Sequence, residues 1–364
     1  MSATGTSPAA RLIGGSPPLH RPMKVTIGYT QSCNLDCRVC YADCTRAPSP
    51  RELPATTWIR LLDEFFEAGV ISVMIEGGEP LHRPDVLEVI AHAAPRAMTR
   101  LRTNATLVDD AMAGRLKAIG LGDAMVDLLG ATPETHDALT GVPGSHARSI
   151  AGIRALRRAG LPVTVLVIMN RGNHRELQPL LELAKAEGAE AVGVLRPYPL
   201  GRMRRDWGTL SLSLQEMMAA IAALRPPEGI RLMQSWHPND ANCCWQMAAV
   251  NAYGHSIGCM YLREYVDYGD VTTMPFLATW DDPLYRHLRA GKVEASCGGC
   301  ASTQHTHGGC RSTAYAFHGR WDAPDPFDSG LNGGVDLRVL PAPGPEPELG
   351  PGLRPGLGAN HDAP

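Results

Sequence analysis

The most regular feature of the chain is the alternation of short apolar runs with amphipathic stretches. Six runs have the length and composition of buried strands, at 25–30, 71–78, 98–107, 123–130, 162–170 and 190–199. Helical spacing follows most of them, at 56–69, from about 84, at 110–119, 149–160 and 174–187. The apolar face of the first helix comprises Trp58, Leu61, Leu62, Phe65 and Phe66. Gly69 then marks its end.

Strand–helix repeats of this kind form a parallel sheet with right-handed crossover connections. Six units are too few for a closed eight-stranded barrel. The pattern therefore predicts the α/β class, with an open, partial (β/α)6 TIM barrel and a smaller C-terminal cysteine-rich domain. In such a barrel the functional side chains lie at the carboxyl ends of the strands.

The composition changes after the last strand–helix unit. A helical stretch at 211–225 leads into a region rich in cysteine, glycine and aromatic residues. The final residues are rich in Pro and Gly without a period and cannot pack a core. We therefore expect a flexible leader at 1–22, the barrel at 23–205, a helical linker at 206–233, the cysteine-rich domain at 234–329 and a disordered tail at 330–364.

Charge and hydropathy exclude several classes of function. The formal net charge is −3, with 34 Lys and Arg against 37 Asp and Glu, and no basic stripe indicates a nucleic-acid partner. No apolar run has the length of a membrane span, and the first 22 residues lack the layout of a secretory signal. The sequence therefore predicts a cytoplasmic protein without a membrane partner, whose ten cysteines indicate metal or catalytic sites.

Three of these cysteines, Cys33, Cys37 and Cys40, stand in a C-x₃-C-x₂-C spacing directly after the first predicted strand. Three thiolates on one loop can bind three irons of a [4Fe–4S] cluster, which leaves the fourth iron open to a small molecule. Zinc is the alternative, because a tetrahedral zinc site also takes clustered cysteines. Cys44 is near enough along the chain to be a fourth ligand.

The second predicted strand ends in a second candidate element, Gly77-Gly78-Glu79-Pro80. Glycine lets the backbone approach a ligand closely, and a carboxylate beside it can hold an ammonium group. On its own this sequence is a common turn. Its position, one strand–helix unit after the three-cysteine loop, makes it more specific.

Together the two elements resemble the radical S-adenosylmethionine (SAM) enzymes, in which an apolar and an aromatic residue flank the third cysteine, here Val39 and Tyr41. The resemblance implies a [4Fe–4S] cluster whose open iron chelates SAM, and a Gly-Gly-Glu-Pro turn that holds the methionine amino group. It also implies that an electron, supplied by a reductase or a flavodoxin, cleaves SAM to a 5′-deoxyadenosyl radical. This radical abstracts hydrogen from a substrate.

The same resemblance assigns individual residues. It implies cluster ligands Cys33, Cys37 and Cys40 and SAM-binding residues Gly77, Gly78, Glu79 and Asn104, the last in a Thr103-Asn104 turn. Arg196, at the end of the sixth strand, either reaches SAM or the substrate or is a surface arginine. Residues 130–141 resemble the segment after the fourth strand of the family, but Leu129 replaces the usual Asp, which argues against a polar ribose contact there. We expect structural roles for His136, Asp137 and Cys44.

A second group of cysteines begins beyond residue 240. Cys244, Gly254 and Cys259 fit a C-x₉₋₁₅-G-x₄-C pattern, and a Cys-Gly-Gly-Cys sequence follows. This region resembles the SPASM or twitch extension of radical SAM enzymes, which holds auxiliary iron–sulfur clusters. Its last part is similar to tetrapyrrole-tailoring members, with His307 and Asp328 where two cysteines are usual. Imidazole and carboxylate groups can both bind iron.

Two ligand arrangements are open in this iron–sulfur domain. In the first, which we favour, one auxiliary [4Fe–4S] cluster is held by Cys244, Cys259 and Cys310 with Cys243, and a second by Cys297, Cys300, His307 and Asp328. In the second, a single auxiliary cluster is bound by Cys244, Cys259, Cys297 and Cys300.

The resemblance implies three hypotheses for function. The first is a maturase that abstracts hydrogen from a ribosomally synthesised precursor peptide and forms a bond or changes an oxidation state, assisted by the auxiliary clusters. The second is oxidation, decarboxylation or epimerisation of a small metabolite such as a tetrapyrrole or a sugar. The third is a metal-stabilised binding module without catalysis. The leader and tail have no room for the usual peptide-recognition domain, so we expect a separate leader-peptide-binding protein or a small substrate.

Overall fold

A computed structural model of the chain describes residues 11–13, 19–235, 246–291, 293–295 and 309–341. Its centre is an eight-stranded sheet in the order β8-β7-β6-β5-β4-β3-β2-β9, in which every neighbouring pair is parallel. The strands are β2 (Lys24–Thr30), β3 (Ser72–Gly77), β4 (Met98–Thr103), β5 (Asp123–Asp127), β6 (Val163–Ile168), β7 (Ala191–Leu195), β8 (Arg231–Gln234) and β9 (Met247–Val250).

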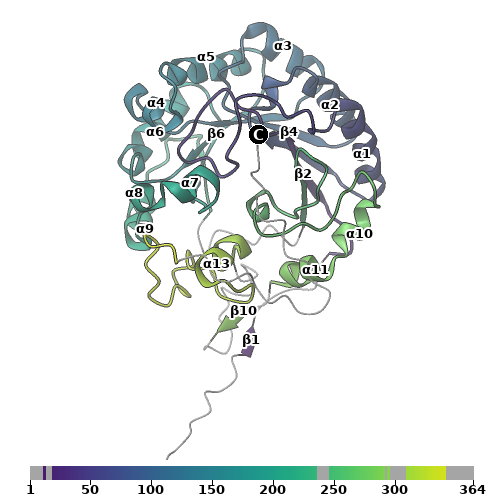
Figure 1. Cartoon of the computed structure of the whole chain (residues 1–364). Helices are drawn as coiled ribbons and strands as arrows, with labels where there is room; N and C mark the ends of the chain where they lie inside the picture. Colours follow the sequence, from purple (N-terminus) through teal and green to yellow (C-terminus); the bar gives the residue numbers. More distant parts are fainter. Residues whose placement is uncertain (1–10, 14–18, 236–245, 292, 296–308, 342–364) are drawn as a thin grey trace, which may run out of the picture.

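Helices cover the convex side of this sheet in an arc that runs from α1 to α6 (Figure 1). They are α1 (Ala55–Glu67), α2 (Val86–Ala93), α3 (Asp110–Ala118), α4 (Pro133–Thr140), α5 (Ser145–Arg158) and α6 (Leu177–Ala186). The edge strands β8 and β9 do not pair with each other, so the barrel is open. The predicted α/β fold with an open, partial TIM barrel is confirmed.

The sheet has two more strands than the six that the sequence predicted. β8 and β9 are only four residues long and lie outside the regular strand–helix alternation, so local patterning did not reveal them. β9 extends the sheet beside β2, with Lys24 opposite Met247 and Ile27 opposite Val250. The C-terminal region therefore begins next to the strand that leads into the cysteine loop.

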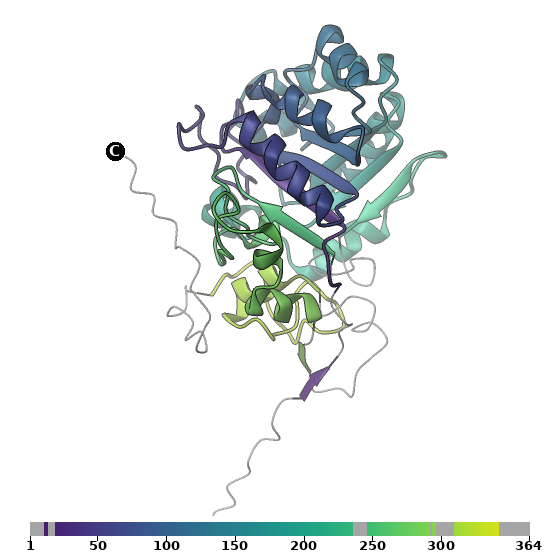
Figure 2. The ribbon, with the colours of Figure 1, turned by 90° about the vertical axis from the view of Figure 1, so that its right-hand side faces the viewer.

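Three helices of the C-terminal part, drawn green to yellow, lie below the half-barrel in the side view (Figure 2). They are α10 (Phe276–Trp280), α11 (Pro283–Ala290) and α13 (Arg311–His318). Helix α7 (Gly201–Arg205) lies within the arc of helices, and α8 (Trp207–Leu210) and α9 (Leu214–Ala222) continue that arc after α6 (Figure 1). The 3₁₀ helix η4 (Met260–Leu262) follows β9. Two short 3₁₀ helices, η1 (Pro80–His82) and η2 (His174–Glu176), follow β3 and β6. None of the helices within the described ranges is long and apolar enough to cross a membrane.

The predicted leader and tail both contain ordered residues. Residues Arg11–Ile13 form β1, which pairs antiparallel with β10 (Val293–Ala295). Leu337 is fully buried, and Trp207 donates a 2.7 Å hydrogen bond from Nε1 to its carbonyl. The prediction of a disordered tail from residue 330 is thus wrong for 330–341, because apolar residues in this stretch pack on the core. The rest of the predicted tail lies outside the described residues.

Candidate functional site

The cysteine loop, residues 31–45, leaves β2 and lies at the carboxyl end of the sheet. Two backbone hydrogen bonds close its base: Cys33 N–H donates to the Thr45 carbonyl, and Thr45 N–H donates to the Gln31 carbonyl, each at 2.8 Å. Within the loop, Cys40 N–H donates to the Cys37 carbonyl at 3.1 Å. Backbone hydrogen bonds within the loop therefore help to fix its conformation.

A cavity of about 620 Å³, counted out to its open mouth, lies over this loop. All three predicted cluster ligands line it, together with the predicted SAM-binding residues Gly77, Gly78 and Asn104. The other lining residues are Leu35, Val39, Tyr41, Cys44, Glu76, Arg102, Thr103, Asp127, Leu129 and Ile168. Most of them end parallel strands, which is where a barrel of this class carries its functional side chains.

Gly77 and Gly78 pack against the cysteine loop itself. A Cβ atom on Gly77 would lie 2.4 Å from the Thr30 carbonyl oxygen, and one on Gly78 would lie 2.0 Å from that of Ser32. Gly77 also has a φ of +138°, which favours glycine. Gly78 N–H donates to the Thr30 carbonyl at 2.7 Å. The glycines therefore permit a close approach of two backbones, in addition to the approach to a ligand that the sequence suggested.

Glu79 is fully buried and is not among the residues that line the cavity. Its carboxylate accepts hydrogen bonds from Asn104 N–H at 2.7 Å, the Thr103 hydroxyl at 2.8 Å and Leu81 N–H at 3.1 Å. Burial raises the pKa of Glu79 to about 7, against the opposing effect of these bonds. These bonds tie the turn after β3 to the end of β4, and the contact between Glu79 and an ammonium group stays a prediction.

Asn104 connects the end of β4 to the cysteine loop. Its amide group donates to Asn34 Oδ1 at 2.9 Å and lies 3.9 Å from Cys33 Sγ. Its own Oδ1 accepts a hydrogen bond from Thr106 N–H at 2.9 Å. These contacts hold the side chain at the wall of the cavity.

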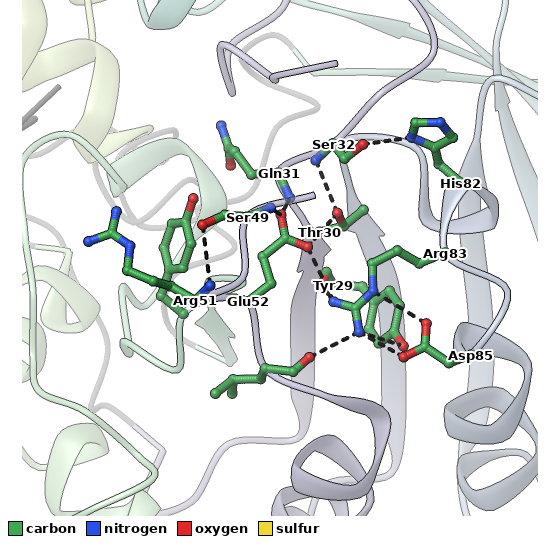
Figure 3. A network of polar contacts seen from close by, with 12 residues as sticks. Tyr29, Thr30, Gln31, Ser32, Ser49, Arg51, Glu52, His82, Arg83 and Asp85 are labelled. Atoms are coloured by element: carbon green, nitrogen blue, oxygen red, sulfur yellow. Dashed lines mark hydrogen bonds and ion pairs between the residues drawn. The ribbon is translucent and has the colours of Figure 1, made fainter. Parts of the chain in front are cut away.

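A second set of polar contacts ties the start of the loop to the chain beyond its end (Figure 3). Glu52, on the returning chain, accepts hydrogen bonds from the Thr30 hydroxyl at 2.7 Å and from Gln31 N–H at 3.0 Å. Arg83 lies 3.2 Å from the same carboxylate and 2.7 Å from Asp85. The loop is thereby fixed to the segment that follows β3.

Helix α7 covers the other side of the loop. A Cβ on Gly201 would lie 2.8 Å from the carbonyl oxygens of Cys40 and Tyr41, and its φ is +53°. Arg202 N–H donates to the Cys40 carbonyl at 2.9 Å, and the Arg202 guanidinium lies 3.1 Å from Asp36. The helix thus places a positive charge beside the three thiols.

Burial is the main cause of the pKa shift of two of these thiols. It raises the pKa of Cys33 to about 12 and that of Cys37 well above its ordinary value. The thiol of Cys44, 3.8 Å from Cys40 Sγ, is the main cause that lowers the pKa of Cys40 to about 6. Three thiolates in one buried place require a compensating cation, and a bound metal deprotonates coordinating thiols outright. The donor set therefore fits a metal–sulfur centre.

The cavity also contains charged residues that the sequence analysis missed. Arg102 on β4 donates two hydrogen bonds to Asp127, at 2.9 and 2.8 Å, and one to Glu76 at 3.4 Å. The Tyr41 hydroxyl donates to Glu76 at 3.1 Å. The available signal was a charged residue at the last or next-to-last position of three consecutive strands, since the carboxyl ends of parallel strands meet at one end of a barrel.

Tyr41 also begins an aromatic group that reaches the C-terminal region. Its ring centroid lies 5.0 Å from that of Tyr261 in η4, and Tyr261 stacks on Tyr198 at 3.6 Å. These rings line a second cavity of about 220 Å³ together with Val39, Ile168, Leu195 and Arg196. Because the two cavities share Tyr41, Val39 and Ile168, residues of both regions of the chain contribute to one continuous wall.

Arg196 is neither a surface residue nor part of the first cavity. Its Nη1 lies 2.6 Å from Asp325 Oδ2, and both side chains are at most 2% exposed. Asp325 also accepts a 2.8 Å hydrogen bond from Cys310 N–H and a 2.7 Å bond from the Thr313 hydroxyl. Burial alone would raise the pKa of Asp325, but Arg196 and these bonds hold it below its ordinary value. Arg196 thus links the half-barrel to the C-terminal region.

The segment after β5 has structural contacts. Leu129 lines the cavity with an apolar side chain, and its N–H donates to His136 Nδ1 at 3.1 Å. Burial lowers the pKa of His136 to about 4. Asp137 instead accepts hydrogen bonds from the Ser145 hydroxyl and His146 N–H, each at 2.8 Å, at the start of α5. His136 and Asp137 therefore serve different elements, which supports the structural roles expected for them.

The auxiliary-cluster candidates are only partly within the described residues. Outside them lie Cys243, Cys244, Cys297, Cys300 and His307. Cys259 is buried shortly after β9, Cys310 precedes α13, and Asp328 is buried with its Oδ1 accepting a 2.8 Å hydrogen bond from Gly330 N–H. Among described residues, no three His, Cys, Asp or Glu side chains are grouped closely enough to hold one metal ion. This includes Cys33, Cys37 and Cys40, each of which would bind a different iron of a cluster. The described candidates therefore do not form a ligand set by themselves.

Gly254, the glycine of the C-x₉₋₁₅-G-x₄-C pattern, adopts a backbone conformation that favours glycine. Its φ is +91°, and a Cβ would lie 2.9 Å from Thr272 Cγ2. The glycine therefore permits the turn between β9 and Cys259.

Comparisons with known proteins agree with this geometry. Residues 27–184 match the radical SAM superfamily, and residues 243–301 match the SPASM iron–sulfur cluster-binding domain. The AdoMet-dependent heme synthase of Methanosarcina barkeri is 27% identical over 335 residues, covering 84% of this chain and 96% of the synthase. The PqqA peptide cyclase of Granulibacter bethesdensis is 26% identical over 325 residues, covering 84% of this chain and 86% of the cyclase.

Among solved structures, Streptococcus suis SuiB bound to precursor peptide SuiA has a TM-score of 0.68 at 18% identity, covering 86% of this chain and 76% of SuiB. At this identity the likeness shows a shared fold. The two domain matches include the three-cysteine loop and several C-terminal cysteines, and they imply a [4Fe–4S] cluster with SAM and auxiliary iron–sulfur clusters. The chain thus contains a radical SAM domain at residues 27–184, followed by a SPASM iron–sulfur cluster-binding domain at residues 243–301.

Proposed function

We propose that this radical SAM enzyme modifies a residue of a ribosomally synthesised precursor peptide. The observation that carries the proposal is the cavity in which the three cysteines and Gly77-Gly78 meet, next to a second cavity walled by both regions of the chain. The similarity to a PqqA peptide cyclase and the fold shared with a SuiB–precursor complex support a peptide as substrate.

Within this proposal, Cys33, Cys37 and Cys40 would hold the cluster, while Gly77, Gly78 and Asn104 line the space where SAM would lie. When bound, the cluster and SAM supply a 5′-deoxyadenosyl radical. The protein keeps water from this radical with the apolar side chains that line the cavity, which are Leu35, Val39, Leu129 and Ile168.

The charged residues of the cavity suit a cationic ligand. Arg102 lies between the carboxylates of Glu76 and Asp127, so this wall has two potential negative charges and one positive charge. SAM carries a sulfonium and an ammonium against one carboxylate. An excess of negative charge in a low-dielectric cavity would therefore stabilise bound SAM.

In the C-terminal region we assign Cys259 and Cys310 to the auxiliary clusters, together with the candidates outside the described residues. Tyr261 follows Cys259 by two residues and also lines the second cavity, so the substrate side and the auxiliary region are adjacent. An external reductase or flavodoxin and a separate leader-peptide-binding protein complete the proposed set of partners.

A small metabolite such as a tetrapyrrole is the second candidate substrate. The observation that favours it is the similarity to a heme synthase, of which the chain covers 96%. Both substrates would use the same cavity, so geometry alone does not separate them.

Mass spectrometry of substrate mixtures distinguishes the two. The anaerobically reconstituted enzyme is incubated with SAM, dithionite and either short peptides encoded beside its gene or a tetrapyrrole. We expect one peptide to change mass in step with 5′-deoxyadenosine formation, and no change with a Cys37→Ser variant. Conversion of the tetrapyrrole in place of every peptide would overturn the proposal.

A further inference from the structure

Cys44 lines the first cavity, although it is not one of the three predicted cluster ligands. It is 5% exposed and lines the same wall as Cys33, Cys37 and Cys40. Its Sγ is 3.8 Å from Cys40 Sγ, within range of a sulfur–sulfur hydrogen bond. The sequence analysis expected only a packing role for this residue.

Cys44 is contacted from two sides, at its backbone carbonyl and at its sulfur. The Arg202 guanidinium of α7 donates to the Cys44 carbonyl, and Cys44 Sγ lies 4.0 Å from the Gly77 carbonyl at the end of β3. The thiol therefore has two acceptors within reach, and the Cys40 sulfur is the nearer one.

A bound cluster would determine which of the two sulfur atoms donates the hydrogen bond between Cys44 and Cys40. A cysteine that binds iron does so as a thiolate, which has no proton and can only accept a hydrogen bond. Cys44 would then be the donor, through its S–H group. Hydrogen bonds to the sulfur atoms are among the factors that set the reduction potential of an iron–sulfur cluster.

We propose that Cys44 is a positioning residue of the radical SAM cluster, whose thiol donates a hydrogen bond to Cys40 Sγ and raises the reduction potential of that cluster. The donor stabilises the reduced cluster more than the oxidised one, because the reduced cluster carries one more negative charge. A weaker reductant can then load it with an electron. This inference rests on the proposed role of Cys33, Cys37 and Cys40 as cluster ligands.

Three substitutions at the same position test it. Cys44→Ala and Cys44→Val both remove the donor, and valine also fills the space, whereas Cys44→Ser keeps a donor. The holoenzymes are poised at the solution potential that reduces half of the wild-type clusters, and the reduced fraction is read by EPR. Only a cluster with an open iron changes its signal when SAM is added, so the SAM-sensitive signal separates this cluster from the auxiliary ones.

We expect fewer than half of the SAM-sensitive clusters to be reduced in Cys44→Ala and Cys44→Val, and about half or more in Cys44→Ser. Equal reduction in all four proteins would overturn the inference. So would a loss in Cys44→Ser equal to that in Cys44→Ala, because packing would then explain both. If Cys44 were a fourth ligand, SAM sensitivity would be absent in wild type and appear in Cys44→Ala. Absence of any SAM-sensitive signal in every variant would instead overturn the ligand assignment itself.

Discussion

At the scale of single residues, His136 shows how a buried group makes the segment after β5 sensitive to pH. Its side chain is fully buried and accepts a hydrogen bond from the backbone N–H of Leu129. The side chain of Leu129 lines the cavity. Its pKa falls from 6.5 to about 4 on folding because burial disfavours the charged ring. Between these values the unfolded chain binds more protons than the folded one.

Stability should therefore decrease as pH falls from about 6.5 towards 4, by at most about 1.4 kcal/mol per pH unit from this residue. Urea denaturation at pH 7.5, 6.5 and 5.5 measures the effect. His136→Asn keeps an acceptor for Leu129 N–H but does not titrate, so its stability should depend less on pH over this range. An identical pH dependence in both proteins would contradict the assignment.

Sequence patterns indicated the residues of the site that are close along the chain. The sequence identifies Cys33, Cys37 and Cys40 as candidate ligands because their spacing within one loop is itself the signal. The role of Arg102 could not be predicted from the sequence, because its partners come from neighbouring strands and lie 25 and 26 residues away. The contacts of Glu79 with the Thr103 hydroxyl and Asn104 N–H were missed for the same reason, because these partners lie 24 and 25 residues away.

At the scale of elements, the site depends on the contact between the end of β3 and the start of the cysteine loop. Gly78→Ala would place a Cβ 2.0 Å from the Ser32 carbonyl oxygen, a backbone atom that no side-chain rotation can move. We expect a loss of about 3 kcal/mol in stability or failure of the loop to retain iron. Chemical denaturation and iron analysis of the purified variant measure both.

Gly114→Ala is the matched control for this substitution. Gly114 is exposed in α3, and no atom lies within 4 Å of the Cβ that would be added. Alanine should stabilise the helix there by about 0.5–1 kcal/mol. If both variants were equally stable and held equal iron, the close contact would not be essential.

The elements themselves were predicted where local patterning is strong. The strands from β2 to β7 and the helix α1 follow directly from apolar periodicity. Four of the five residues on the predicted face of α1 are buried, and the fifth, Phe66, is half-buried. β9 was not predicted, because a four-residue strand is stabilised by its pairing with β2 and has little signal of its own. Leu337 was likewise placed in a tail because neighbouring glycines and prolines dominate the local composition.

At the scale of the whole molecule, Arg196 and Asp325 connect the half-barrel to the C-terminal region across 129 residues of sequence. Asp325→Asn removes the charge that compensates a buried guanidinium and weakens the bond to Cys310 N–H. Breaking one side of a buried ion pair costs about 3–5 kcal/mol. Denaturation monitored by fluorescence should show this loss.

A surface ion pair provides the comparison. Asp110 pairs with Arg158 at 2.7 Å, but these side chains are 71% and 59% exposed. Asp110→Asn should cost no more than about 1 kcal/mol. Equal losses in the two variants would mean that the buried pair has no special part in joining the two regions.

Iron content tests the number of auxiliary clusters. The variant that combines Cys33→Ala, Cys37→Ala and Cys40→Ala should keep about eight irons per chain if two auxiliary [4Fe–4S] clusters are bound, as we favour. Wild type should contain about twelve. About four irons in the variant would contradict the two-cluster arrangement and support the single set of Cys244, Cys259, Cys297 and Cys300.

The central claim is that three cysteines leave one iron open to SAM. The most direct measurement is 5′-deoxyadenosine, quantified by chromatography after anaerobic incubation of the reconstituted protein with SAM and dithionite. Wild type should form it, and Cys37→Ala should not, although that variant retains its auxiliary iron. Wild-type protein that contains zinc in place of iron, or that is fully loaded with iron yet forms no 5′-deoxyadenosine, would contradict the account.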